Sequence, residues 1–268
     1  MGNNGNKTNK GGSEDIAALL RAAEAEGKLS RHAATVLNLV DPGAQIQAAL
    51  GISVDDVGTS EVVLVTLMPD DSSSIRSSGN IQAVQDGHNA ILDALGKSKQ
   101  RDAVLCHTRY LNGHVLYPYT LLENARRMDG TNYSPDSGTP LYDQTVVLLG
   151  TVIAKNQEFL EAGVAVRSVT LIITDGADEH STRASAADVA ALVGDLSRAG
   201  HIVAAMGIGD GHFDFRAVFR SMGIEDRWIL TAANSPSDIR RAFQIFSQSA
   251  VALSQSAPIA RSAGGFGN

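Results

Sequence analysis

The sequence predicts an α/β protein with a doubly wound, mostly parallel sheet that carries helices on both faces. From about residue 60 onward, short apolar runs rich in β-branched residues alternate with longer amphipathic stretches, as in parallel strands joined by crossover helices. The run Glu61 to Met68 is too short for an ordinary helix and stops at Pro69, which favours a central strand covered on both faces. Two later runs meet at Asn112-Gly113, a dipeptide typical of hairpin turns, and this predicts one antiparallel edge strand.

Composition divides the chain into four segments. Residues 1–12 contain Gly, Asn and Lys without an apolar stretch and are predicted to be a disordered tail, as are residues 256–268. Residues 13–58 are predicted to form three short helices and a linker, with Ser13 as the first N-cap and Pro42 at a first helical position. The α/β domain then covers residues 59–255. Because three such helices bury little surface alone, we expect them to pack on this domain, with docking on another protein as the alternative.

Within the domain, apolar periodicity and helix-boundary residues assign each element. Asn80 is a predicted N-cap, and His88 falls on the apolar face of the helix that follows, so we interpret it as a core residue. Residues 120–138 form a long loop that leads to Thr139. The predicted helices cover 81–96, 139–160, 184–198, 213–222 and 236–253, and the predicted strands cover 61–68, 103–111, 114–119, 166–174, 201–207 and 228–232.

Charge and cysteine content exclude several classes of partner. The formal net charge is −7, and the chain lacks a cluster of Lys and Arg that would release counterions from phosphates, so we expect neither nucleic acid nor an anionic membrane as the main partner. Cys106 is the only cysteine, so no intrachain disulfide can form and a reducing, cytoplasmic environment is expected. Apolar segments fall short of the ~20 residues that a membrane span requires, which predicts a soluble protein.

Small oxygen-bearing side chains follow the first predicted strand directly. Asp70, Ser72 and Ser74 stand at a spacing of two, so their oxygens converge on one point if this segment stays extended. Ligands gather at the carboxyl ends of strands in open α/β sheets, and a carboxylate with hydroxyls suits Mg²⁺, Mn²⁺ or Ca²⁺ better than zinc. A solvated loop whose hydroxyls satisfy backbone groups is the alternative interpretation of these residues alone.

Two further oxygen ligands occur downstream in matching contexts. Thr139 opens a predicted helix, and Asp175 ends another apolar strand. With these residues in this order, the sequence resembles the von Willebrand factor A (vWA) family and its metal-ion-dependent adhesion site, over roughly residues 60–255. All five positions of the motif are present: Asp70, Ser72, Ser74, Thr139 and Asp175. The sequence departs from the family at Ser73, where many members have Gly, and at Ile75-Arg76, where some integrin-type members carry acids for a second metal.

The resemblance implies a non-enzymatic, divalent-metal-dependent module that binds protein. In this family, an Asp or Glu from a partner displaces a water molecule from a Mg²⁺ ion, so that the metal becomes part of the interface. Intracellular bacterial members often work with MoxR-type AAA ATPases or in stress and conflict systems. The resemblance therefore also implies a cytoplasmic bacterial protein with a protein partner.

Two other functions are compatible with the sequence. The segment from Asp175 to His180 includes Asp178 and Glu179, and these carboxylates with the imidazole could serve a metal-dependent hydrolase by moving a proton. A self-assembling structural subunit is the second alternative. The segment Gly207-Ile208-Gly209-Asp210-Gly211 imitates a dinucleotide-binding loop, but its GxGxG spacing favours an ordinary strand-end turn.

Overall fold

The fold is built on one sheet, seen in a computed structural model that describes residues 10–209, 211, 213–255 and 265–266. In these residues six strands are hydrogen-bonded in the order β3-β2-β1-β4-β5-β6. Neighbouring strands are parallel, except that β2 and β3 are antiparallel. The predicted fold class and its antiparallel edge are thus confirmed. The strands are β1 (Glu61–Met68), β2 (Val104–Arg109), β3 (Val115–Leu121), β4 (Ala165–Thr174), β5 (Ile202–Gly209) and β6 (Ile229–Ala233).

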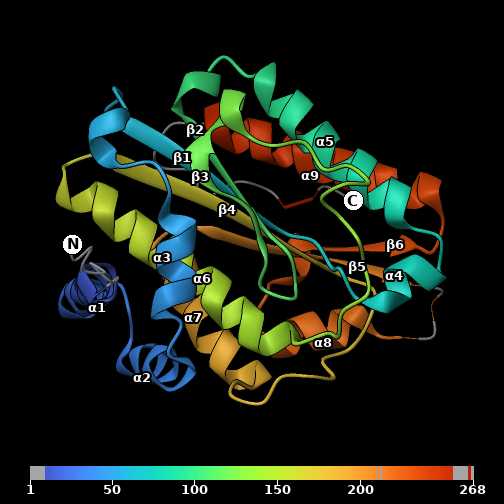
Figure 1. The fold of residues 1–268 in the computed structure, drawn as a ribbon, viewed down its shortest axis with the longest axis horizontal. Coiled ribbons are helices and arrows are strands. Elements are labelled where there is room, and N and C mark those ends of the chain that lie inside the picture. The colour runs from blue at the N-terminus through green and yellow to red at the C-terminus, as the bar shows by residue number, and fades with distance from the viewer. Residues whose placement is uncertain (1–9, 210, 212, 256–264, 267–268) are drawn as a thin grey trace, which may run out of the picture.

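Helices cover both faces of the sheet (Figure 1). One face carries α5 (Ile81–Gly96) and α9 (Pro236–Gln255), which pack along each other. The other face carries α6 (Leu141–Glu161), α7 (Ala186–Arg198) and α8 (Phe215–Ser221). A short helix, α4 (Ser73–Ser77), follows β1 at its carboxyl end. Among the described residues, no helix is both long and apolar enough to cross a membrane.

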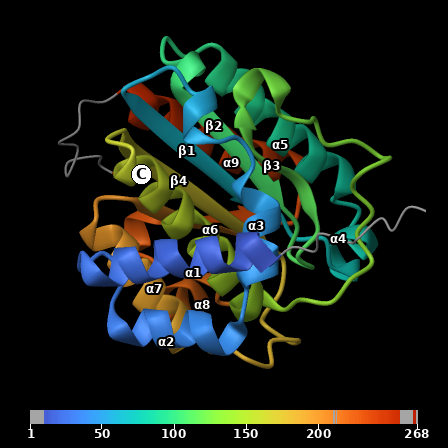
Figure 2. The same ribbon diagram turned by 60° about the vertical axis from the view of Figure 1, so that its left-hand side comes forward.

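Three N-terminal helices lie against the outer side of α6 and α7 (Figure 2). They are α1 (Lys10–Ala25), α2 (Arg31–Val40) and α3 (Gly43–Leu50). The approach to α6 is close, because a Cβ atom on Gly150 would lie 2.7 Å from Leu37 of α2 and 3.1 Å from Ile46 of α3. Intrachain packing of these helices, rather than a free surface awaiting a partner, is therefore what the structure has.

The linker after α3 is anchored by a buried charge. Lys155 of α6 has no solvent exposure, and its Nζ atom donates to the carbonyl of Ile52 and to Glu158 at 2.9 Å. The linker also reaches the edge strand, because the Ile52 N–H donates to the Tyr119 carbonyl at 2.9 Å. These bonds fix the path by which the N-terminal segment enters β1.

Both predicted tails differ in part from the structure. Helix α1 begins at Lys10, so Ser13 lies inside the helix and the N-cap prediction is wrong. An N-cap is worth about 1 kcal/mol, a local preference that packing of α1 on α6 can override. At the other end, Phe266 is buried and its ring centroid lies 5.3 Å from that of Trp228, so the prediction of disorder is wrong for this residue. The rest of both predicted tails, residues 1–9, 256–264 and 267–268, lies outside the described residues.

Candidate metal site

The predicted ligands meet at the carboxyl edge of the two central strands. Strands β1 and β4 pair in parallel with Met68 opposite Ile172, so the segments that follow them leave the sheet side by side. Asp70 is the second residue after β1, and Asp175 is the first residue after β4. The sheet register therefore brings together two carboxylates that are far apart in the sequence.

The segment from Asp70 to Ser74 does not stay extended throughout, which was the condition under which the spacing of two would make its oxygens converge. Ser72 has extended backbone angles, φ −69° and ψ 161°, but α4 begins at Ser73 and places Ser74 in its first turn. The hydroxyls still converge, since Ser72 Oγ lies 2.8 Å from Ser74 Oγ. The first turn of α4, rather than the alternation of side chains along an extended segment, therefore brings the hydroxyls of Ser72 and Ser74 together.

The three innermost oxygens form a triangle of suitable size for a small divalent ion. Ser74 Oγ lies 2.6 Å and Ser72 Oγ lies 3.4 Å from Asp175 Oδ1, beside the 2.8 Å between the two hydroxyls. Mg²⁺ binds oxygen at about 2.1 Å in octahedral geometry, so adjacent ligands on it lie about 3 Å apart. The donor set therefore fits a divalent cation that prefers oxygen ligands.

Asp70 supports this triangle from behind. It is fully buried, and its Oδ1 atom accepts from the Ser72 N–H at 2.7 Å. Its Oδ2 atom accepts from the Thr174 hydroxyl at 2.7 Å and from the Asp175 N–H at 3.2 Å. Tyr133 donates its hydroxyl to the Asp70 carbonyl. Both carboxylate oxygens are thus held by protein donors, so Asp70 contributes its negative charge and fixes the positions of Ser72 and Asp175.

Negative charge is concentrated at this edge of the sheet. Burial raises the pKa of Asp175 from 3.8 to about 6; the charge of Asp70 adds to this effect, whereas the hydrogen bond from Ser74 opposes it. Burial also raises the pKa of Asp71 to about 7, with a smaller contribution from Asp70 and an opposing hydrogen bond from the Asn112 backbone. Partly desolvated carboxylates that repel one another are stabilised by a cation.

Thr139 is held beside the other four residues through its backbone. Its carbonyl accepts from the N–H groups of Glu179 at 3.1 Å and His180 at 3.3 Å, and its own N–H donates to His180 Nδ1 at 2.9 Å. In the part of the chain that the structure describes, its hydroxyl makes no hydrogen bond to Asp70, Ser72, Ser74 or Asp175. The structure therefore brings four of the five predicted residues into one hydrogen-bonded cluster and places Thr139 in the loop fastened to it.

The long loop before Thr139 is pinned at several points. The backbone N–H groups of Asp136 and Ser137 donate to the Asp71 carbonyl at 3.1 and 3.2 Å, and the Ser73 N–H donates to the Ser137 carbonyl at 3.1 Å. Further back, Met128 and Asn89 of α5 exchange two hydrogen bonds of 2.9 Å. A loop this long needs such anchors if it is to hold Thr139 two residues after Ser137 in a fixed place.

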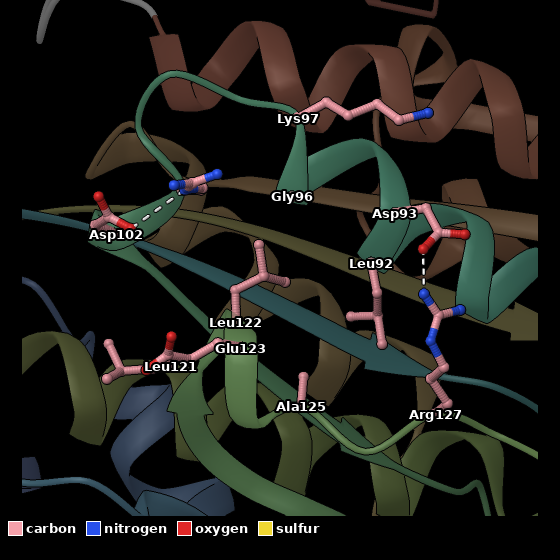
Figure 3. A pocket seen from close by; sticks show the side chains of 11 residues that line it. Leu92, Asp93, Gly96, Lys97, Asp102, Leu121, Leu122, Glu123, Ala125 and Arg127 are labelled. Atoms are coloured by element: carbon pink, nitrogen blue, oxygen red, sulfur yellow. Dashed lines mark hydrogen bonds and ion pairs between the residues drawn. The ribbon is translucent and has the colours of Figure 1, made fainter.

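A cavity of about 710 Å³, whose lining side chains are drawn in Figure 3, includes none of the predicted metal ligands in its lining. It is bounded by the second half of α5, the 3₁₀ turn Arg101–Ala103 that precedes β2, and the segment that follows β3. The ion pair between Asp93 and Arg127 closes one side and ties α5 to the long loop. The cavity lies beside the start of β2, and so at the amino ends of the parallel strands. The carboxylates of Asp70 and Asp175 follow the carboxyl ends of β1 and β4.

Two of the residues proposed for hydrolysis, Asp178 and His180, have structural partners. Because the Thr139 N–H donates to His180 Nδ1, that nitrogen acts as the acceptor, so the basic nitrogen of the neutral ring is already in use. Asp178 Oδ1 accepts from the Tyr142 N–H at 3.2 Å and from the Ser181 hydroxyl at 2.5 Å. Gly138 permits this arrangement, since a Cβ atom there would lie 2.8 Å from the His180 ring. The loop therefore holds the start of α6 in place.

Sequence reasoning missed three residues that order the site. Thr174 bonds Asp70, Asn112 bonds Asp71 through its N–H, and Tyr133 bonds the Asp70 backbone. Thr174 precedes Asp175, and its position at a strand end was the one available signal. Of the glycine-rich segment, Gly207 and Gly209 lie in strand β5, where Cβ atoms on them would lie 2.2 and 2.6 Å from Phe215, and Asp210 lies outside the described residues.

Comparisons with known proteins bear on the fold. No protein-family model matches the sequence, and no curated protein matches it. Among solved structures, the pilus adhesin SpaC from Lactobacillus rhamnosus GG aligns with a TM-score of 0.53 and 12% identity over 72% of this chain and 31% of that one. The von Willebrand factor type A protein from Catenulispora acidiphila aligns with a TM-score of 0.47 and 19% identity over 72% of this chain and 43% of that one.

A third similar structure is proximal thread matrix protein 1 from the mussel byssus with a zinc-occupied MIDAS motif. It aligns with a TM-score of 0.48 and 16% identity over 71% of this chain and 46% of that one. In all three cases the alignment spans less than half of the other chain. Likenesses at these identities show the fold alone. With its strand order and its antiparallel edge, the chain has a vWA fold.

Proposed function

We propose that the protein is a divalent-metal-dependent module that binds another protein through the cluster at the carboxyl edge of β1 and β4. The observation that carries this proposal is the oxygen triangle of Ser72, Ser74 and Asp175, whose sides are 2.6 to 3.4 Å. Hydroxyls and carboxylates of this kind bind hard cations, and Mg²⁺ keeps several water molecules when so few protein ligands hold it.

The bound ion would supply Lewis acidity to an incoming ligand. The protein residues supply the rest: Ser72 and Ser74 offer hydroxyl oxygens, Asp175 offers a carboxylate, and Asp70 places its charge behind them. Thr139 offers its hydroxyl from the pinned loop. In the oxygen triangle only Asp175 offers a charged oxygen, so an ion held there would keep positive charge among its direct ligands, and an Asp or Glu from a partner is the ligand that fits best.

The proposal extends to partner and setting. We infer a protein partner that offers a carboxylate, and the resemblance to intracellular bacterial vWA proteins makes a MoxR-type AAA ATPase in a bacterial cytoplasm the first candidate. We infer a non-enzymatic role, because His180 and Asp178 are used to hold the Thr139 junction. Neither nucleic acid nor membrane is a proposed partner, in line with the net charge of −7.

Metal binding can be measured directly with Mn²⁺ by electron paramagnetic resonance or calorimetry. The wild-type protein should bind one ion at the site, and Ser74→Ala should bind it at least tenfold more weakly because it loses one oxygen ligand. Ser77→Ala is the matched control: Ser77 lies in the same short helix, but its hydroxyl donates to the Ser74 carbonyl and is not part of the oxygen triangle. Equal Mn²⁺ affinity in all three proteins would refute the site.

The partner is tested by affinity capture with and without EDTA. We expect a specific partner to be retained by wild type in Mg²⁺ and lost in EDTA, and lost by Ser74→Ala under both conditions. If Mn²⁺ binds at this cluster but captured proteins are indifferent to EDTA, the metal site stands and the carboxylate-mediated interface is wrong.

A further inference from the structure

A row of polar side chains crosses the sheet beneath α6. On this face, Phe159 of α6 packs with Leu64 of β1 and Leu105 of β2 in one apolar cluster. Side chains alternate along a strand, so the next residues on the same face are Thr66 and His107, which are paired in register. Thr66 is also paired with Thr170 of β4. All three side chains have no solvent exposure.

Part of this row has hydrogen-bond partners within the protein. Thr66 Oγ1 lies 2.6 Å from the Tyr119 hydroxyl, and His107 Nδ1 lies 2.8 Å from the Tyr117 carbonyl. A carbonyl only accepts, so Nδ1 carries the proton, and Nε2 of the neutral ring is a bare acceptor. Burial is the main cause that lowers the pKa of His107 to about 3, so the ring is neutral near pH 7.

The remaining polar groups of this row have no hydrogen-bond partner among the described residues. Among the described residues, no protein group hydrogen-bonds to His107 Nε2, Thr170 Oγ1 or Ser168 Oγ. Ser168 lies two residues before Thr170 on the same face and is 1% exposed. On α6, Thr145 lies on the same helical face as Leu141, Leu148, Val152 and Phe159, and its buried hydroxyl also has no protein partner.

A second group of such atoms lies at the end of β2. Arg109 is fully buried on the His107 face, and its Nη2 donates to Gln45 and to the Gly113 carbonyl, each at 3.2 Å. Its Nε and Nη1 atoms and the Oε1 atom of Gln144 have no protein partner in the described part of the chain. A Cβ atom on Gly113 would lie 3.0 Å from Gln144 Oε1, so the two unpaired groups flank the same residue.

Leaving so many buried donors and acceptors unpaired in one layer would be costly. Each unpaired group loses its hydration without a replacement hydrogen bond, and native proteins rarely contain more than a few such groups. In native proteins, ordered water molecules usually supply the missing hydrogen bonds of such groups. A buried water molecule needs two to four polar partners close together. The row offers an acceptor at His107 and hydroxyls at Thr170 and Ser168, and the second group offers guanidinium donors and an amide oxygen.

We propose that ordered water molecules occupy the layer between α6 and the sheet, bonded to His107 Nε2, Thr170 and Ser168 in the row and to Arg109 and Gln144 at its end. Water is the ligand that fits, because these groups are buried and a water molecule can donate to His107 Nε2, accept from the Arg109 guanidinium, or do either with a hydroxyl. The layer separates the apolar cluster around Phe159 from the candidate metal site.

The direct experiment is a crystal structure of the wild-type full chain at a resolution that resolves bound water. It should contain peaks within hydrogen-bond distance of His107 Nε2 and Thr170 Oγ1. A well-ordered layer without such peaks, or with His107 Nε2 bonded to a protein group after a side-chain rearrangement, would overturn the proposal. This measurement does not depend on any variant folding.

A matched pair of variants gives a second readout. Thr170→Val and Thr66→Val each remove one hydroxyl from the same buried row, but within the described part of the chain the Thr66 hydroxyl has a protein partner and the Thr170 hydroxyl has none. If water satisfies Thr170, both variants should lower the melting temperature, by roughly 2–8 °C for a domain of this size. If the layer is dry, Thr170→Val relieves an unpaired hydroxyl and should raise the melting temperature, and this result would refute the proposal.

Discussion

Removal of the charge of Asp175 should stabilise the metal-free protein and abolish its response to Mg²⁺. Asp175→Asn keeps an oxygen that can accept from Ser74, which donates to Oδ1 at 2.6 Å, but removes a carboxylate whose pKa is raised from 3.8 to about 6. That difference corresponds to about 3 kcal/mol at 1.36 kcal/mol per pKa unit. Since the carboxyl stays partly open to solvent, which screens it, we expect about 1–2 kcal/mol.

The direction of the pH dependence follows from the raised pKa. The folded protein binds a proton at Asp175 more tightly than the unfolded chain does, so the carboxylate destabilises the fold fully above pH 6 and not at all well below pH 3.8. The advantage of Asp175→Asn in EDTA should therefore be largest at pH 7.5 and should shrink toward pH 4. Urea denaturation at several pH values measures it.

The metal response provides the complementary result. An ion that binds only the folded state stabilises by about 2.7 kcal/mol at a hundred times its Kd, or roughly 5–10 °C for a chain of this size. Wild type should gain this increment in Mg²⁺ and Asp175→Asn should not. Glu179→Gln, at an exposed position of the same loop, is the control and should keep the Mg²⁺ increment. A wild type indifferent to both Mg²⁺ and Mn²⁺, or an Asp175→Asn variant less stable than wild type in EDTA at pH 7.5, would refute the reasoning.

Three other predictions follow from the structure. Thr139→Ala should reduce the Mg²⁺-induced rise in melting temperature; an unchanged rise, with only the ~0.5–2 kcal/mol loss expected of a helix-junction threonine, would remove Thr139 from the site. Gly150→Ala should destabilise the fold, because its Cβ would lie 2.7 Å from a side chain of α2. Gly194→Ala is the control: its Cβ would have nothing within 4 Å, so it should stabilise the fold by up to about 1 kcal/mol. Equal effects of the two variants in thermal melts would contradict the close packing of the N-terminal helices. Burial lowers the pKa of His88 to about 4 and that of His107 to about 3, so the folded protein resists protonation of both rings. Each histidine should therefore lower the free energy of unfolding by up to about 2 kcal/mol at pH 5 relative to pH 7, a loss that begins below pH 6.5. A His88→Gln variant with the wild-type pH profile in urea denaturation would contradict this.

The strands of the α/β domain and its mostly parallel sheet with one antiparallel edge could be predicted because their signals are local and strong. Glu61 to Met68 was predicted residue for residue, since an eight-residue apolar run bounded by Pro and Asp leaves little choice. The hairpin at Asn112-Gly113 followed from turn chemistry, and Gly113 has the positive φ of 94° that such a turn requires. Where burial decides the outcome, as for His88, periodicity was also enough.

Features that depend on distant contacts were not predictable. Helix α4 begins at Ser73, whose N–H donates to the carbonyl of Ser137, a residue 64 positions later in the chain. No local sequence pattern predicts this hydrogen bond. Phe266 is buried against Trp228, although its neighbours in the sequence are Gly, Asn and Ala. The support of Asp70 by Thr174 likewise depends on the register of β1 and β4.

The pairing of β1 with β4 has a consequence for the order of folding. The Asp175 N–H donates to Asp70 across 105 residues, and the helix α5, the β2–β3 hairpin and the helix α6 all lie between them in the chain. Closing a loop of this length comes late, since its entropy must be lost before the contact rewards it. A nascent chain that stops short of β4 holds the serines but not their acceptor. We therefore expect Mg²⁺ to slow unfolding while leaving the refolding rate nearly unchanged, and stopped-flow kinetics in which Mg²⁺ mainly accelerates refolding would contradict this order.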